Sequence, residues 1–206
     1  MIIEGIKTVG LCGRSGSGKG YISKCFEMHG IPAIDTDQVY REIIGGGASS
    51  ECVSELVTYF GPSIVDSEGK LVRKKLAGIV FAPGNSDSLK ILNSITHKYI
   101  LAETIKRAKE YKTAGVRSLI IDAPVLFESG FSYWCDVKIC VTAPEKVQIR
   151  RICERDGIME FEAKRRLDNQ MSEDELRRLC DCEIVNDGTG NMLDVTKSVA
   201  ENFGLI

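Results

Sequence analysis

Short apolar runs alternate with longer stretches in which apolar residues recur at helical spacing along this 206-residue chain. The runs lie at residues 9–12, 32–34, 119–121, 137–141 and 183–185. Strands that alternate with helices form a parallel sheet that is covered on both faces. The pattern therefore predicts an α/β fold, with a parallel five-stranded sheet and helices on both of its faces.

A glycine-rich segment at residues 13–20 follows the first run and precedes a predicted helix at 21–29. Its glycines let several N–H groups point at one polyphosphate, and the helix adds its positive N-terminal end. Lys19 supplies a cation for the outer phosphates, so the segment predicts a phosphate loop. The residues expected to bind the nucleotide are Arg14, Ser15, Gly16, Ser17, Gly18, Lys19, Gly20 and Tyr21.

A glycine-rich turn that binds nothing is the alternative interpretation of this segment. A lysine at the N-terminus of a helix is electrostatically unfavourable unless an anion compensates it. A purely structural turn gives Lys19 no reason to be there, so nucleotide binding is the better account. The next residue in phosphate loops is usually a Ser or Thr whose hydroxyl binds magnesium, and Gly20 replaces it here.

Polar residues cluster after the predicted strands, at the sheet edge where active sites of parallel sheets lie. Besides the phosphate loop they are Asp35, Asp37, Asp122 and Asn186. An acid beside a bound polyphosphate is repelled by it unless a metal ion intervenes, so Asp122 indicates magnesium held at this edge. The alternative is that Asp122 is a simple turn residue before Pro124.

Two long stretches separate the strands. Residues 38–115 predict helices broken at 45–47, 61–62 and 83–85, too long for a simple crossover, and we expect a helical insertion that covers a substrate. Residues 144–179 are rich in arginine and predict a helical lid. We expect one unit, whose core comprises about residues 1–37, 116–143 and 180–206.

Composition narrows the class of partner. A net charge of −2 and a pI near 5.8 argue against a broad basic face for nucleic acid. No apolar run approaches the roughly 20 residues of a membrane span, and the eight cysteines include no C-x-x-C pair, so zinc is not expected. We expect a cytoplasmic protein, a monomer or weak homo-oligomer, with a small anionic ligand and neither nucleic acid nor membrane as a partner.

Several separated motifs, in matching order and spacing, make the chain resemble the dephospho-CoA kinase family from about residue 8 to 190. They are Gly10-Leu11-Cys12-Gly13 with the phosphate loop, Ile34-Asp35-Thr36-Asp37, Phe60-Gly61 with residues 66–73, Asp122-Ala123-Pro124-Val125-Leu126-Phe127-Glu128, Arg155-Asp156 and Ile184-Val185-Asn186-Asp187-Gly188. The resemblance implies a P-loop, adenylate-kinase-like fold with a helical substrate insertion and a mobile lid. It also implies that ATP, with Mg²⁺, phosphorylates the ribose 3′-hydroxyl of dephospho-CoA to give CoA and ADP, the last step of coenzyme A biosynthesis.

The resemblance also implies roles for single residues. Asp37 would accept or orient the proton of the ribose 3′-hydroxyl; its alternative is a helix cap, and Asp35 is the competing carboxylate. Arg151 and Arg155 share a helix face and fall on lid positions. The alternative is that they simply lie on a solvent-exposed helix face and pair with neighbouring glutamates. The expected catalytic residues are Lys19, Asp37, Arg151 and Arg155; the substrate residues are Asp35, Arg73 and His97; and Asp122 holds the metal through water.

The chain departs from the family pattern at four places. Gly20 and Tyr21 replace residues that often carry small hydroxyls, Lys98 follows His97 where proline is usual, and Arg14 with Ser15 replaces a smaller apolar pair. These departures leave two alternatives open. One is a divergent paralogue that phosphorylates a nucleoside, a nucleotide or another small hydroxyl acceptor, and the other is a nucleotide-binding regulator that has lost its chemistry.

Overall fold

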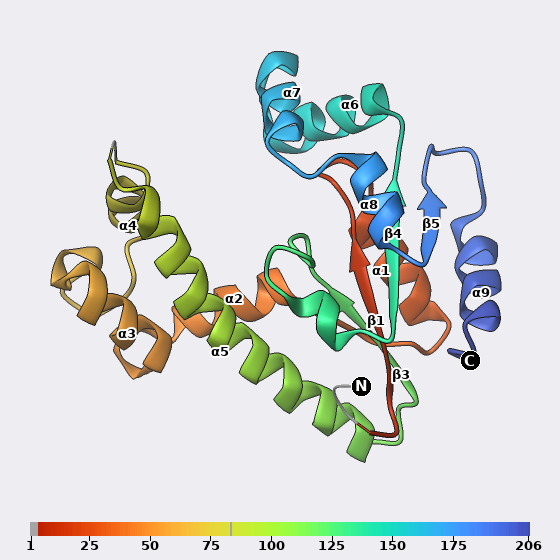
Figure 1. Ribbon diagram of the computed structural model, residues 1–206, viewed down its shortest axis with the longest axis horizontal. Coiled ribbons are helices and arrows are strands. Elements are labelled where there is room, and N and C mark those ends of the chain that lie inside the picture. Colours follow the sequence, from red (N-terminus) through yellow and green to blue (C-terminus); the bar gives the residue numbers. More distant parts are fainter. Residues whose placement is uncertain (1–3, 83) are drawn as a thin grey trace. The chain divides into compact units, whose positions relative to one another are not determined.

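The computed structural model describes residues 4–82 and 84–206 and is shown in Figure 1. Contacts within the chain define two compact units. The first comprises Met1–Asp35 with Ala108–Ile206, and the second comprises Thr36–Arg107. Pro83, part of the predicted break at 83–85, lies outside the described residues.

The first unit is built on one sheet of five parallel strands in the order β2-β3-β1-β4-β5. The strands are β1 (Lys7–Cys12), β2 (Ala33–Asp35), β3 (Ser118–Asp122), β4 (Val137–Thr142) and β5 (Cys182–Val185). The prediction of a parallel five-stranded sheet is therefore confirmed. Every residue of β3 is buried, as expected for an interior parallel strand covered on both faces.

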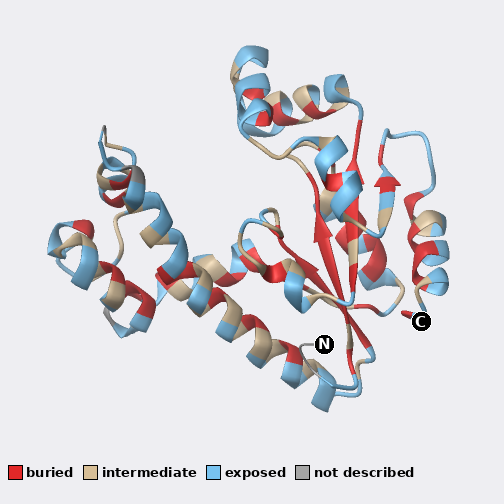
Figure 2. Cartoon of the chain, viewed as in Figure 1, coloured by how far each residue is buried: buried red, intermediate tan, exposed pale blue. Residues whose placement is uncertain are grey.

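Helices of the first unit surround this sheet. They are α1 (Lys19–Met28), α6 (Glu145–Asp156), α7 (Glu160–Asp168), α8 (Glu173–Leu179) and α9 (Met192–Asn202). Helices α1 and α9 pack on each other and share one apolar core with the sheet, in which Phe26, Leu11 and Ile139 are fully buried. Figure 2 shows strands β1, β3 and β4 almost continuously buried, whereas the helices alternate buried and exposed positions.

The stretch predicted as a lid, 144–179, comprises α6, α7 and α8. Helices α6 and α7 share a small apolar core of Ile152, Ala163 and Leu167, so they form one packed pair. Helix α8 packs against β4. Its first turn carries Glu173, Asp174 and Glu175, where carboxylates are favoured by the helix dipole.

The second unit is helical. Its helices are α2 (Thr36–Gly45), α3 (Glu51–Phe60), α4 (Arg73–Val80) and the greater part of α5 (Ser86–Thr113), which continues into the first unit. Leu56, Ile64 and Leu76 belong to an apolar core of its own. The α-helices end at the predicted breaks 45–47 and 61–62: short 3-10 helices follow at Gly47–Ser49 and Pro62–Ile64, and Gly61 between α3 and the second of them has φ +86°. Among the described helices, none has the length and apolarity that a membrane span requires.

The observed boundaries of the helical unit differ from those expected for an insertion at 38–115. Helix α2 begins at Thr36, directly after β2, and no loop separates the two elements. At the other end, the last residues of α5 pack with the first unit.

Close packing beneath the phosphate loop generates a stability prediction at Gly10 in β1. A Cβ atom at this position would lie 2.8 Å from Leu126 Cδ2 and 2.9 Å from Cys135 Sγ. We expect Gly10→Ala to lower the free energy of unfolding by about 1–3 kcal/mol, the usual cost of overpacking a core. Gly78 in α4 is the matched control, because nothing lies within 4 Å of its Cβ position.

Gly78→Ala should raise the free energy of unfolding by about 0.5–1 kcal/mol, since alanine is the better helix former. Denaturant titration followed by circular dichroism measures both variants. Unchanged stability of Gly10→Ala would show that Leu126 and Cys135 move aside without cost.

Candidate active site

The segment between β1 and α1 has the backbone geometry of an anion cradle. The N–H of Ser17 donates to Arg14 O at 3.1 Å and closes a tight turn, and Gly18 has φ +85° immediately before α1. Within the described residues, the N–H groups of Gly16 and Gly18 bond to no other group of the chain. These amides and the N-terminus of α1 are suited to bind phosphate oxygens.

Two carbonyl groups of the same loop, those of Gly16 and Ser17, accept hydrogen bonds from side chains far away in the sequence. Arg151 Nη1, on α6, donates to Gly16 O at 3.2 Å and to Ser17 O at 3.2 Å. Asn186 Nδ2, which follows β5, donates to Ser17 O at 2.9 Å. A predicted lid arginine therefore contacts the loop itself, and an asparagine with no assigned role contacts it too.

Lys19 and Asp122 meet at the carboxyl edge of the sheet, where Lys19 Nζ forms a close ion pair with Asp122 Oδ1. Their side chains are 15% and 7% exposed. Strand register places Asp122 beside Leu11 of β1 on one side and Asp35 of β2 on the other. The sheet thus brings Asp35, Asp122 and the first residue of α1 to one edge, as parallel strands require.

The predicted lid arginines have different surroundings. Arg155 donates from Nε to Asp156 Oδ1 at 2.7 Å and from Nη2 to Asp156 Oδ2 at 2.9 Å, and its side chain is exposed. Arg166 also pairs with Asp156. The two guanidinium groups, Arg155 first, hold the pKa of Asp156 well below its usual range. Arg155 is thus displayed at the surface, whereas Arg151 is turned inward.

Two residues expected to bind the nucleotide contact the end of α7. Arg14 Nη2 donates to Leu167 O at 2.6 Å, and the N–H of Ser15 donates to Gln170 Oε1 at 2.9 Å. Farther along the loop, Tyr21 is 55% exposed, and nothing lies within 4 Å of the Cβ position of Gly20. Gly20 therefore leaves open space where other phosphate loops carry a hydroxyl.

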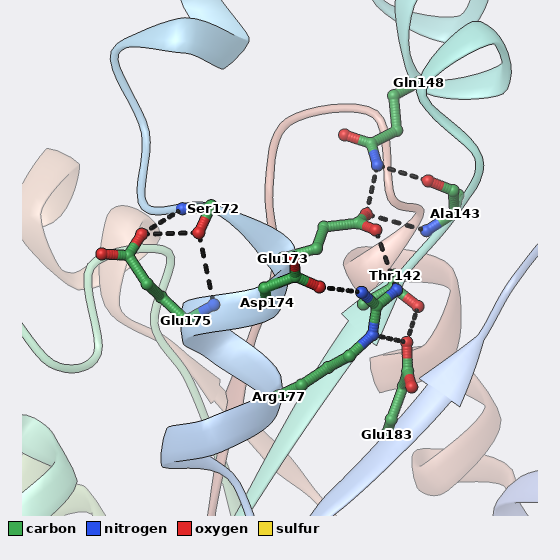
Figure 3. Close-up of polar contacts among 9 residues, drawn as sticks. All are labelled: Thr142, Ala143, Gln148, Ser172, Glu173, Asp174, Glu175, Arg177 and Glu183. Atoms are coloured by element: carbon green, nitrogen blue, oxygen red, sulfur yellow. Dashed lines mark hydrogen bonds and ion pairs between the residues drawn. The ribbon is translucent and has the colours of Figure 1, made fainter.

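A polar network anchors α6 and α8 to the sheet (Figure 3). The buried Gln148 side chain donates to Ala143 O and to Glu173 Oε1. Arg177 Nε donates to Glu183 Oε1 at 2.8 Å, and Thr142 Oγ1 donates to the same oxygen at 2.5 Å. Since a Cβ on Gly16 would lie 2.5 Å from Gln148 O, this network also fixes a surface against the phosphate loop.

In the second unit, Asp37 lies in the first turn of α2. Because α2 begins at Thr36, Asp37 is inside the helix and not at its N-cap position. Tyr40 follows three residues later on the same helix face, and the Arg73 guanidinium lies 5.9 Å from the centre of its ring. Burial, the larger effect, raises the pKa of Tyr40, and Arg73 opposes it. Asp37, Tyr40 and Arg73 thus form one polar face.

The remaining substrate candidates lie elsewhere. Asp35 ends β2 and belongs to the first unit. His97 is half-buried in α5, and burial lowers the pKa of its imidazole, which favours the neutral ring. The role of His97 in binding the acceptor stays a prediction.

Two of the eight cysteines, Cys12 at the end of β1 and Cys180 after α8, contact each other. Cys12 Sγ lies 3.6 Å from Cys180 Sγ, and the hydrogen bond between them, the largest effect, raises the pKa of Cys180 to about 12. Thiols of such high pKa are poor nucleophiles and poor metal ligands at neutral pH. In the part of the chain that the structure describes, no three His, Cys, Asp or Glu side chains are grouped as metal ligands.

Comparison with known proteins gives the family. A family model described as dephospho-CoA kinase matches residues 7–191, and a dephospho-CoA kinase of Geobacillus kaustophilus is 34% identical over 182 residues, covering 88% of this chain and 89% of the relative. The chain belongs to the dephospho-CoA kinase family. The resemblance predicted from the motifs is thereby confirmed, and so is the assignment to the kinases, for which the family implies ATP as co-substrate.

Solved structures support the fold of this dephospho-CoA kinase family member. A Thermus thermophilus protein superposes with a TM-score of 0.81 at 26% identity, over 97% of this chain and 98% of its own. The dephospho-CoA kinase of Campylobacter jejuni superposes with a TM-score of 0.68 at 24% identity, over 95% and 96%. The predicted phosphate-loop kinase fold is confirmed.

The position of Lys19 generates a prediction on turnover. Lys19→Ala should lower kcat by about 10²-fold or more, because it removes a cation aimed at charge that develops on the phosphates. Lys24→Ala is the matched control, since Lys24 lies exposed on the same helix. Initial rates with ATP and dephospho-CoA, with circular dichroism to verify folding, test the role. A folded Lys19→Ala variant with near-normal turnover would refute it.

Proposed function

We propose that this protein transfers the γ-phosphoryl group of ATP to the ribose 3′-hydroxyl of dephospho-CoA, giving CoA and ADP. The observation that carries the proposal is the family match over residues 7–191, which spans both the phosphate loop and the whole helical unit. The paired Lys19 and Asp122 at the mouth of the loop supply the charges that phosphoryl transfer needs.

In the proposed reaction the 3′-oxygen attacks the γ-phosphorus, and the bond to the β–γ bridging oxygen breaks as ADP leaves. The amides of Gly16 and Gly18 hold phosphate oxygens, and Lys19 turns from Asp122 to the outer phosphates. Asp37 accepts a hydrogen bond from the 3′-hydroxyl, aligns its oxygen, and takes the proton late in the transfer. Most of the catalysis is then positioning and charge stabilisation.

Asp122 is the proposed protein anchor for magnesium. Its carboxylate is a hard oxygen ligand at the sheet edge, and Gly20 offers no hydroxyl. Magnesium commonly keeps several waters and takes few protein ligands, so one aspartate with phosphate oxygens and water fits its chemistry. When bound, the ion neutralises charge on the transferring phosphoryl group and orients the phosphate chain.

Of the two arginines proposed from the sequence, Arg155 is the better candidate to touch the phosphoryl group. It is exposed, and within the described part of the chain its ion-pair partner is the neighbouring Asp156, from which a phosphate can displace it. Arg151 already donates to loop carbonyls, which favours an indirect effect on the nucleotide.

For the acceptor, we propose that Arg73 of α4 binds a substrate phosphate. Its guanidinium lies over the ring of Tyr40, and Tyr40 shares a face of α2 with Asp37. Asp35 and His97 are retained as acceptor-binding candidates.

Product analysis tests the proposed function directly. The purified protein is incubated with ATP and dephospho-CoA, and mass spectrometry with nuclear magnetic resonance locates the added phosphate. A 3′-phosphate on the adenosine ribose supports the proposal. Phosphorylation of a nucleoside or nucleotide, with none of dephospho-CoA, would instead establish the divergent paralogue. ATP binding without transfer to any of these acceptors would favour the regulator.

The assignment of Asp37 predicts a selective catalytic defect. Asp37→Asn should reduce kcat by about 10²- to 10⁴-fold, the usual range for a positioned general base, while the affinity for ATP changes little. Asp35→Asn is the matched comparison, because it makes the same change two residues earlier. Steady-state kinetics and ATP titration measure both. A larger kcat defect in Asp35→Asn would move the role to that carboxylate.

The open space at Gly20 generates a prediction on metal dependence. Gly20→Ser should fit without strain, since nothing lies within 4 Å of its Cβ position, and should alter the magnesium requirement modestly. Asp122→Asn should substantially raise the magnesium concentration needed for half-maximal rate, because it removes the anionic ligand. Rate is titrated against magnesium for both variants. An Asp122→Asn curve that overlays the unsubstituted protein would remove Asp122 from the metal site.

A further inference from the structure

The carbonyl oxygen of Ser17 accepts two hydrogen bonds from side chains far away in the sequence. Asn186 Nδ2 donates to it at 2.9 Å and Arg151 Nη1 at 3.2 Å. Asn186 is only 4% exposed. The buried side-chain amide of Asn186 is therefore satisfied by a carbonyl of the phosphate loop. The turn itself does not require this contact, so the contact is best explained by what it does to the Ser17–Gly18 peptide.

Peptide geometry connects this carbonyl with the amide of Gly18. In a trans peptide group the C=O and the following N–H point in opposite directions, and none of the described peptide bonds is cis. Holding Ser17 O against Asn186 and Arg151 therefore aims the Gly18 N–H away from them, on the side left open for a phosphate. Hydrogen bonds to the carbonyl also polarise the peptide group and strengthen its N–H as a donor.

We propose that Asn186 and Arg151 are positioning residues, which fix the Ser17–Gly18 peptide so that the Gly18 N–H binds a nucleotide phosphate. The inference rests on the proposed function only in requiring that the loop binds a polyphosphate. It assigns Arg151 an action through the loop, in place of the direct contact expected from its lid position.

The surroundings make this support rigid. Arg151 Nη1 also donates to the backbone carbonyl oxygen of Asn186 at 3.1 Å, so the arginine holds the backbone of the asparagine as well as the loop. The N–H of Asn186 donates to Thr142 O at 2.8 Å, which ties it to the end of β4. Loss of the Arg151 side chain therefore also loosens the backbone of Asn186.

The same contact explains why residue 18 is a glycine. A Cβ at Gly18 would lie 2.1 Å from Asn186 Nδ2 and 3.4 Å from Arg151 Nη1. Only glycine lets the asparagine approach the loop this closely, and its φ of +85° also favours glycine.

The test is Asn186→Leu, which keeps a similar size, adds no charge and removes the donor. Asn202→Leu is the matched control, since Asn202 is exposed at the end of α9. Affinities for inorganic tripolyphosphate and for ADP are measured by calorimetry on the full chain, with folding verified by circular dichroism. We expect Asn186→Leu to weaken both ligands by about 10-fold or more, less than the effect of deleting a direct donor.

Tripolyphosphate distinguishes phosphate positioning from recognition of the nucleoside, and neither measurement involves dephospho-CoA. Unchanged tripolyphosphate affinity in folded Asn186→Leu overturns the proposal, whether or not ADP binding falls. If that variant does not fold, Arg151→Lys replaces it: the lysine keeps the charge but cannot reach all three carbonyls, and a loss of tripolyphosphate affinity of less than about twofold would equally overturn it.

Discussion

Both polar groups of a buried peptide need hydrogen-bond partners, and the arrangement around residues 13–20 supplies partners for the loop carbonyls while leaving the amides of Gly16 and Gly18 for a ligand. The carbonyls of Gly16 and Ser17 find their donors on α6 and after β5. On the same helix as Arg151, the buried Gln148 donates to Glu173, the first residue of α8. The loop, the sheet edge and the helices of 144–179 thus form one hydrogen-bonded assembly.

This arrangement changes how the stretch 144–179 is understood. It is tied to the loop by Arg151 on α6 and by Leu167 and Gln170 at and just after the end of α7. A displacement of α7 would strain the amide of Ser15, since Gln170 accepts its hydrogen bond. The geometry of the loop and the position of α7 are therefore linked, whereas Arg155, near the end of α6, pairs with the neighbouring Asp156.

The sheet was predictable because interior parallel strands are buried on both faces and so appear as unbroken apolar runs. Strand β2 begins one residue later than predicted: Pro32 has no N–H for a ladder, although its carbonyl still accepts from Ile120 at 2.9 Å. Lys19 and the glycines were evident from local spacing alone. The donors behind the loop were not, because Arg151 and Asn186 reach Ser17 across 134 and 169 residues of sequence.

The strand order has a consequence for synthesis of the chain. Strands β1 and β2 do not pair with each other; each pairs with β3, and β1 also with β4. Between β2 and β3 the ribosome must produce the whole helical unit, Thr36–Arg107. The first two strands emerge without any partner and wait through that interval with their edges unpaired, while the helical unit already has every residue of its own core. Both strands keep unpaired edges until residue 118 emerges, and the phosphate loop acquires the second of its supports, Asn186, only after the last strand is complete.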